Sequence, residues 1–133
     1  MLTVPKHFID DIISHAKGAA PLECCGILAG KDGAATHIYK MKNTEDDPDK
    51  YFMEPKEQFA VIKDMRTKGI DMLAIYHSHP HSPARPSGVD INLSYYPDAV
   101  YIIVSLMDSV KPVMKGFLIK DGKVEETAIK IKI

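Results

Sequence analysis

Two stretches of the sequence, 72–76 and 99–106, are apolar without the alternation that marks a half-exposed strand. Unbroken apolar runs of this length predict strands that are covered on both faces. Such strands need helices packed against their sheet, and apolar side chains at helical spacing predict two amphipathic helices, over 5–18 and 55–68. The runs therefore predict a layered protein of the α/β or α+β class.

Two Asp-Gly pairs mark tight turns, because both central positions of such a turn favour residues that tolerate positive φ. The acidic stretch 43–50 is expected to be an exposed loop. Each Asp-Gly pair lies between two apolar stretches and predicts a hairpin: 25–29 with 36–41 around Asp32-Gly33, and 113–120 with 124–133 around Asp121-Gly122.

A short third helix is expected to begin at Ser87 and to end before Pro97, within about two turns. The resulting order, α, β, β, α, β, α, β, β, β, predicts one mixed β-sheet with helices packed against it. The sequence leaves the order of the strands in the sheet open. At 133 residues, the chain is expected to form a single domain, 1–133, with a core of its own.

Charge and composition argue against several classes of partner. The chain has 17 basic and 18 acidic residues, a net charge of −1 and no basic block, so it lacks the positive footprint of a nucleic-acid-binding protein. Its longest apolar run, 99–107, is far shorter than the ~20 residues of a membrane span, and its N-terminus lacks the apolar core of a secretory signal. We therefore expect a cytoplasmic protein that binds neither nucleic acid nor membrane.

The two cysteines of the chain, Cys24 and Cys25, are neighbours in the sequence. Their Cα atoms are ~3.8 Å apart, which is too close for an ordinary disulfide. We expect both to be small buried residues, and the alternative is a thiol role near a functional site. Two adjacent thiols alone do not decide between these interpretations.

The buried strand at 72–76 runs directly into a histidine-rich stretch. Alternate side chains of a strand point the same way, so His77 and His79 project from one face and can bind one metal ion. The proline-rich loop that follows is long enough to return Asp90 to the same place as an oxygen ligand. Two histidines and one carboxylate leave a tetrahedral Zn²⁺ with an open position, which is the pattern of a catalytic zinc site.

Each part of this pattern has an ordinary alternative. Two histidines at i and i+2 are more often solvated or core side chains than metal ligands. Ser87 and Asp90 also have the spacing of a helix capping box, in which Ser87 accepts an N–H of the first turn and Asp90 lies near the positive end of the helix. His81 falls outside the ligand spacing and is expected to be an exposed loop residue.

The complete string, His-x-His, then seven residues, then Ser-x-x-Asp, is much more specific and resembles the motif of the JAMM (MPN-plus) zinc metalloprotease family. The family's upstream Glu-x-Cys-Gly element also has a counterpart, at 23–26. The resemblance covers nearly the full chain and is to the standalone prokaryotic members. It implies one JAMM/MPN domain whose mixed sheet and helices resemble the cytidine deaminase fold.

By that resemblance, His77, His79 and Asp90 ligate one Zn²⁺ per chain, Glu23 is the general base, and Ser87 steadies the oxyanion of the tetrahedral intermediate. The implied chemistry is amide hydrolysis, in which Glu23 takes a proton from zinc-bound water and returns it to the leaving amine. A carboxylate beside a buried strand would have a raised pKa. The residues alone do not distinguish Glu23 from the other candidates, Glu45, Glu54 and Glu57.

The implied function is a zinc-dependent metallopeptidase or isopeptidase that hydrolyses the bond after the C-terminal Gly-Gly of a ubiquitin-like or sulfur-carrier protein. The alternative is a non-catalytic MPN-type interaction or scaffold module, although such modules have lost the metal ligands and this chain has all five motif residues. A nucleobase deaminase would need H-x-E and P-C-x-x-C ligands, which the sequence lacks. The oligomeric state stays open, with a homodimer among the alternatives.

Overall fold

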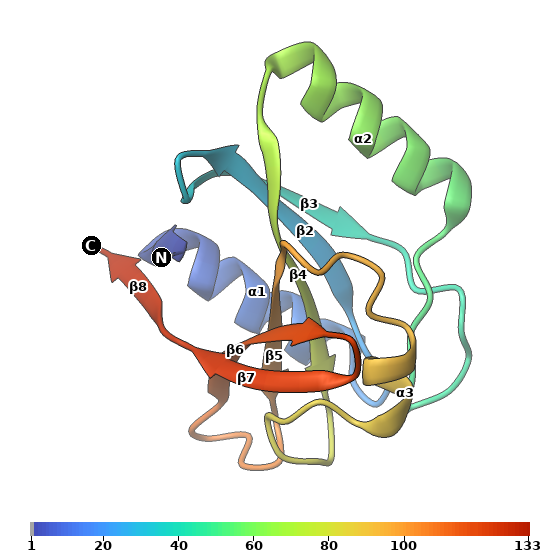
Figure 1. Ribbon diagram of the computed structural model, residues 1–133. Coiled ribbons are helices and arrows are strands. Elements are labelled where there is room, and N and C mark those ends of the chain that lie inside the picture. Colours follow the sequence, from blue (N-terminus) through green and yellow to red (C-terminus); the bar gives the residue numbers. More distant parts are fainter. Residues whose placement is uncertain (1) are drawn as a thin grey trace.

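The protein forms one eight-stranded mixed sheet with helices packed against it (Figure 1). The computed structural model describes residues 2–133. The strand order is β7-β6-β5-β4-β2-β3-β1-β8, and the predicted fold class is confirmed. The elements are β1 (Leu2–Pro5), α1 (Lys6–Ala19), β2 (Cys25–Lys31), β3 (Ala34–Met41), α2 (Pro55–Lys68), β4 (Asp71–His79), α3 (Gly88–Asn92), β5 (Val100–Ser105), β6 (Val113–Lys120), β7 (Lys123–Thr127) and β8 (Ile129–Lys132).

Each face of the sheet has its own hydrophobic core. On one face, α1 buries Phe8 and Ile12 against the central strands. On the other face, α2 contributes Val61 and Met65 to a second core. The central strands β4 and β5 are thus covered on both sides, which explains why their apolar residues do not alternate with polar ones. None of the helices within residues 2–133 has the length and apolar character that crossing a membrane requires.

The alternation of β4 decides which face of the sheet carries the histidines. Tyr76 belongs to the core under α1, whereas Ile75 belongs to the core under α2. Because successive side chains of a strand point to opposite faces, His77 and His79 lie on the α2 face. Ser78 lies on the α1 face, where its Oγ accepts the N–H of Cys24 at 2.8 Å.

The signals in the sequence locate the two long helices closely. The second begins at Pro55, as predicted, and the αL residue Gly69 (φ 66°) closes it. The first was predicted over 5–18 and spans Lys6–Ala19, so Gly18 does not end it. It stops just before Pro21, because the residue preceding a proline is driven to an extended conformation.

The two predicted Asp-Gly turns are confirmed. Asp32 and Gly33 have φ of 52° and 77°, and Asp121 and Gly122 have φ of 52° and 75°. Positive φ at both central positions matches the right-handed twist of the paired strands. The turns set the registers of the β2–β3 and β6–β7 hairpins.

Two predictions at the ends of the chain are wrong. No strand was expected over Leu2–Pro5, yet these residues form β1, which pairs in parallel with β3 and β8. The single strand expected over 124–133 is two strands, β7 and β8, which lie at opposite edges of the sheet although only Ala128 separates them. The sheet must therefore curl until its edges approach each other. Accordingly, a Cβ added at Gly116 of β6 would meet the side chain of Ile129 in β8.

Candidate active site

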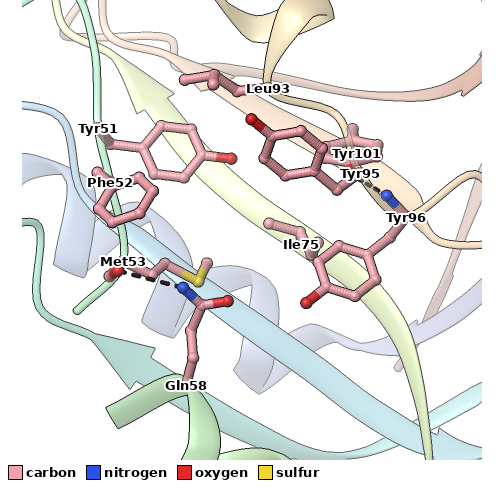
Figure 2. A pocket seen from close by; sticks show the side chains of 9 residues that line it. All are labelled: Tyr51, Phe52, Met53, Gln58, Ile75, Leu93, Tyr95, Tyr96 and Tyr101. Atoms are coloured by element: carbon pink, nitrogen blue, oxygen red, sulfur yellow. Dashed lines mark hydrogen bonds between the residues drawn. The ribbon is translucent and has the colours of Figure 1, made fainter. Parts of the chain in front are cut away.

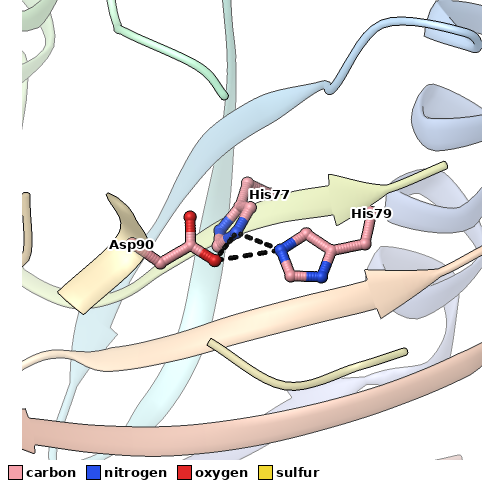
Figure 3. A group of neighbouring side chains, drawn as sticks. All are labelled: His77, His79 and Asp90. Atoms are coloured by element: carbon pink, nitrogen blue, oxygen red, sulfur yellow. Dashed lines mark hydrogen bonds and ion pairs between the residues drawn. The ribbon is translucent and has the colours of Figure 1, made fainter. Parts of the chain in front are cut away.

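Three side chains singled out from the sequence converge on one point (Figure 3). His77 and His79 come from the end of β4, Asp90 comes from α3, and all three are buried. The Nε2 atoms of His77 and His79 lie 3.1 and 2.9 Å from the same oxygen, Oδ2 of Asp90. The two Nε2 atoms lie 3.1 Å apart.

The chemistry of these donors fits a bound cation. Nδ1 of His79 lies 2.8 Å from the carbonyl oxygen of Pro83, which can only accept, so Nδ1 carries the hydrogen. When the ring is neutral, its Nε2 therefore presents a lone pair to the carboxylate of Asp90. Acceptors that face one another at hydrogen-bond distance need a proton or a metal ion between them. Two imidazole nitrogens and one carboxylate oxygen form a donor set suited to Zn²⁺.

Burial and mutual hydrogen bonds shift the pKa of all three groups. Burial lowers the pKa of His77 below its ordinary value. Burial would also lower the pKa of His79, but hydrogen bonds with Asp90 and Pro83 outweigh it and the net direction is upward. Burial would raise the pKa of Asp90, but hydrogen bonds with both histidines hold it well below the usual range. Asp90 is therefore ionised at neutral pH and available as a ligand.

Asp90 is placed by the capping box expected from the sequence. Oγ of Ser87 accepts the N–H of Asp90 at 3.1 Å, and Oδ2 of Asp90 accepts the N–H of Ser87 at 2.9 Å. The hydroxyl hydrogen of Ser87 is not used in this box, because Oγ acts there as an acceptor. The cap thus holds the carboxylate beside the histidines and leaves Ser87 with a hydrogen to donate.

Glu23 reaches the same face through the register of β2 and β4. Cys25 pairs with His77, and two hydrogen bonds join Cys24 to Ser78, so the chain before β2 runs on beside the end of β4 and brings Glu23 close to the histidines. Glu23 is 3% exposed, and its Oε1 has no hydrogen-bond partner among residues 2–133. Burial first, and then the charge of Asp90, raise the pKa of Glu23 to about 8.

Tyr51 adjoins the three candidate metal ligands, although no pattern in the sequence pointed to it. Its ring stacks on His77 with centroids 4.6 Å apart and an interplanar angle of 27°. Among residues 2–133, Nδ1 of His77 has no hydrogen-bond partner, so this stacking supports a ring whose Nδ1 edge has no polar contact. No local spacing could have linked Tyr51 to the histidines, because the two segments are far apart in the sequence.

Tyr51 also forms one wall of an apolar recess (Figure 2). The recess lies between the loop before α2 and the segment after α3, with Ile75 of β4 at its floor. Most of its lining is aromatic. The lining residues are Tyr51, Phe52, Met53, Gln58, Ile75, Leu93, Tyr95, Tyr96 and Tyr101.

The cysteines and His81, also considered in the sequence, are not among the candidate metal ligands. Cys24 and Cys25 are both free and buried, in keeping with their interpretation as small core residues. Burial raises the pKa of Cys24 to about 11 and that of Cys25 further, so both thiols are protonated at neutral pH. His81 is exposed in the loop after β4, as expected.

A comparison with protein families agrees with this geometry. The model of the family described as prokaryotic homologs of the JAB domain matches residues 5–116, a range that contains every residue of the candidate site. The chain belongs to this family. The resemblance to the prokaryotic members of the JAMM family is thereby confirmed.

Individual relatives of this JAB-family protein match almost the whole chain. It is 33% identical to the CysO-cysteine peptidase of Mycobacterium tuberculosis, over 98% of this chain and 91% of the relative. It is also 33% identical to a probable TtuB-protein conjugate cleaving protease of Thermus thermophilus, over 92% of this chain and 79% of the relative. A solved structure of a Desulfitobacterium hafniense protein superposes with a TM-score of 0.89 at 40% identity, covering 99% of this chain and 93% of that one.

Proposed function

We propose that this JAB-family protein is a zinc-dependent peptidase or isopeptidase that cleaves the bond after the C-terminal Gly-Gly of a ubiquitin-like or sulfur-carrier protein. The observation that carries the proposal is the convergence of three buried donors, His77, His79 and Asp90, close to the buried carboxyl group of Glu23. Relatives named as a CysO-cysteine peptidase and a conjugate-cleaving protease support the same class of substrate.

The proposed metal site holds one zinc ion per chain through His77, His79 and Asp90. Zinc in such a site supplies a Lewis acid for the scissile carbonyl and lowers the pKa of a bound water from 15.7 to about 7. The carbonyl oxygen of Pro83 orients His79, and the capping box with Ser87 orients Asp90. Partners of this kind fix the direction in which a ligand presents its lone pair.

Glu23 and Ser87 carry the remaining chemistry of the proposal. Glu23 takes a proton from the attacking water and gives it to the leaving amine, and a pKa near neutrality suits a group that must do both. Ser87 accepts the N–H of Asp90 and can donate its own hydrogen to the oxyanion. The roles as cap and as oxyanion donor are compatible, because they use different parts of one hydroxyl.

The surroundings of the site suit an extended tail on a folded partner. The loop after β4 contains three prolines, at 80, 83 and 86, and forms a stiff wall beside the metal ligands. Glycines are slim enough to approach backbone and metal closely. The aromatic recess beside Tyr51 offers apolar contact area a short distance from the chemistry. Most of the binding energy would come from the partner's folded surface, and a free Gly-Gly peptide would be a poor substrate.

The experiment compares three substrates at equal concentration with the zinc-loaded protein. They are fusions of several intact ubiquitin-like proteins, short peptides that contain Gly-Gly, and an unrelated unfolded protein. We expect efficient cleavage of at least one fusion after Gly-Gly and little cleavage of the other two classes. Equal cleavage of all three would show a general peptidase and contradict the proposal.

Two further measurements separate the enzyme from the scaffold module. Metal analysis should find about one zinc per chain, because one set of three ligands is available. Glu23→Gln should retain zinc and lose about 10²- to 10⁴-fold in turnover, since an amide cannot move the proton. A protein that neither contains nor takes up zinc, and hydrolyses none of the fusions, would favour the scaffold interpretation.

A further inference from the structure

Asn43 closes the loop between β3 and α2 with all the hydrogen-bonding capacity of its side chain. Its Nδ2 donates to the carbonyl oxygens of Glu23, at 2.9 Å, and of Lys50, at 3.4 Å. Its Oδ1 accepts the N–H groups of Glu45, at 2.9 Å, and of Phe52, at 3.0 Å. A primary amide has two donors and two acceptor lone pairs, so no other side chain of this size makes the same four bonds.

The first of these bonds holds the backbone at Glu23. This residue lies just before β2, outside the regular strand. Its carboxyl oxygen Oε1 lacks a hydrogen-bond partner within residues 2–133, so no hydrogen bond at this atom fixes the side chain and the placement of the backbone matters more. On one side, Cys24 is bonded to Ser78 of β4; on the other, the amide of Asn43 holds the Glu23 carbonyl.

The same amide holds both neighbours of Tyr51. Lys50 accepts from Nδ2 through its carbonyl, and Phe52 donates to Oδ1 through its N–H. The residue between them, Tyr51, is thereby presented to His77, on which its ring stacks. The side chain of Asn43 thus connects the backbone of Glu23 with the ring of Tyr51, which stacks on the candidate metal ligand His77.

We propose that Asn43 is a positioning residue. It holds the carboxylate of Glu23 and the ring of Tyr51 in place beside the three candidate metal ligands. This inference rests on the proposed function, because it assigns to Asn43 a role in the work of Glu23. Asn43 holds the backbone around the base and makes no hydrogen bond to the candidate metal ligands. Removing its side chain should therefore reduce turnover without abolishing metal binding.

Two substitutions at Asn43 and one neighbouring control separate this role from simple support of the loop. Asn43→Asp keeps both acceptors for the amides of Glu45 and Phe52 and loses both donors, whereas Asn43→Ala loses all four bonds and adds no charge. The control is Thr44→Ala. Thr44 Oγ1 also ties the loop, by donating to the carbonyl of Phe52 at 3.0 Å, but it has no hydrogen bond to Glu23.

With the best fusion substrate, we expect both Asn43 variants to lose about 10- to 100-fold in kcat while they retain zinc, since a displacement of about 1 Å can cost that much. Thr44→Ala should stay close to wild type. In a Glu23→Gln background, Asn43→Ala should cause a clearly smaller further loss, because the base that it positions has already been removed and only its support of Tyr51 remains. Unchanged kcat in the zinc-loaded Asn43 variants, or a full additional loss in the Glu23→Gln background, would overturn the inference.

A second readout does not depend on activity. In metal-free protein labelled with ¹³C at the glutamate carboxyl groups, the resonance of Glu23 should shift or broaden in both Asn43 variants and stay unchanged in Thr44→Ala. If the wild-type protein cleaves no fusion, the proposed function fails, and this resonance still tests the positioning. A Glu23 resonance that is the same in all four proteins would overturn it.

Discussion

The buried carboxyl group of Glu23 should make the metal-free protein lose stability as the pH rises. Its pKa is about 8 in the folded protein, against an ordinary value of 4.5. Between these values the unfolded chain has released the proton and the folded chain still holds it. The folded state therefore binds more protons, and the free energy of unfolding falls with increasing pH across this window. The contribution is fully present below the lower value and is lost as the pH passes through the upper one.

The expected size follows from the two pKa values. Each unit of pKa difference is worth about 1.4 kcal/mol, so ionising Glu23 in the folded metal-free protein costs about 5 kcal/mol. Relative to low pH, the free energy of unfolding is lowered by less than about 1 kcal/mol at about pH 5, and by nearly the full amount at about pH 9. Total stabilities of domains are about 5–15 kcal/mol, so the effect should be easy to detect.

The assay is urea unfolding of the metal-free protein, followed by circular dichroism in the presence of a chelator. Glu23→Gln keeps the shape of the side chain and cannot ionise, so the difference between the two proteins isolates Glu23 from the histidines and Asp90. We expect the variant to gain about 4 kcal/mol relative to wild type between about pH 5 and about pH 9. Stability curves that run parallel across this range would refute the reasoning. Added zinc should weaken the pH dependence, because a nearby cation favours the carboxylate.

Three other substitutions test separate parts of the structure. Asp90→Ala should lower the zinc content measured by mass spectrometry, since neither histidine can replace the third donor, whereas the exposed Asp98→Ala should leave it unchanged. Ser87→Ala should lose the helix cap and with it about 1 kcal/mol of stability in urea unfolding. The variant should also lose about 10²-fold in kcat if the hydroxyl is the main oxyanion donor. A zinc-loaded variant with the wild-type rate would show that Ser87 has no part in the mechanism. Gly26→Ala should destabilise the protein by about 1–3 kcal/mol, because the added Cβ would overlap the fully buried ring of Tyr76, and an unchanged urea midpoint would contradict the close packing of that pair.

Features that depend on neighbours in the sequence were predicted well. The limits of α2 follow from Pro55 at its start and Gly69 after its end, and both Asp-Gly turns have the positive φ that their residues favour. The pairing of His77 with His79 on one face needs only the alternation of a strand. The capping box of Ser87 and Asp90 likewise lies within a single turn of helix.

Features that depend on distant pairing were not predicted. The strand β1 is too short to be recognised alone and exists because β3 and β8 lie on either side of it. The acidic loop at 43–50 was expected to be merely exposed, yet its first residue, Asn43, is half-buried and bonded to Glu23. Such contacts join segments that are distant in the sequence, and no local pattern in either segment predicts the other.

The sequence by itself therefore determined the types of element and the chemical character of the donors, because helix periodicity, turn conformation and strand alternation act over a few residues. Only the tertiary structure decided which carboxyl group lies beside the three candidate metal ligands. Glu23 could not be separated from the other glutamates by local pattern, and it is selected because the antiparallel pairing of β2 with β4, in which Cys25 lies opposite His77, brings it beside the end of β4. That register is set by burying both faces of β2 and β4 together, which is a property of the whole packed sheet and of no single segment.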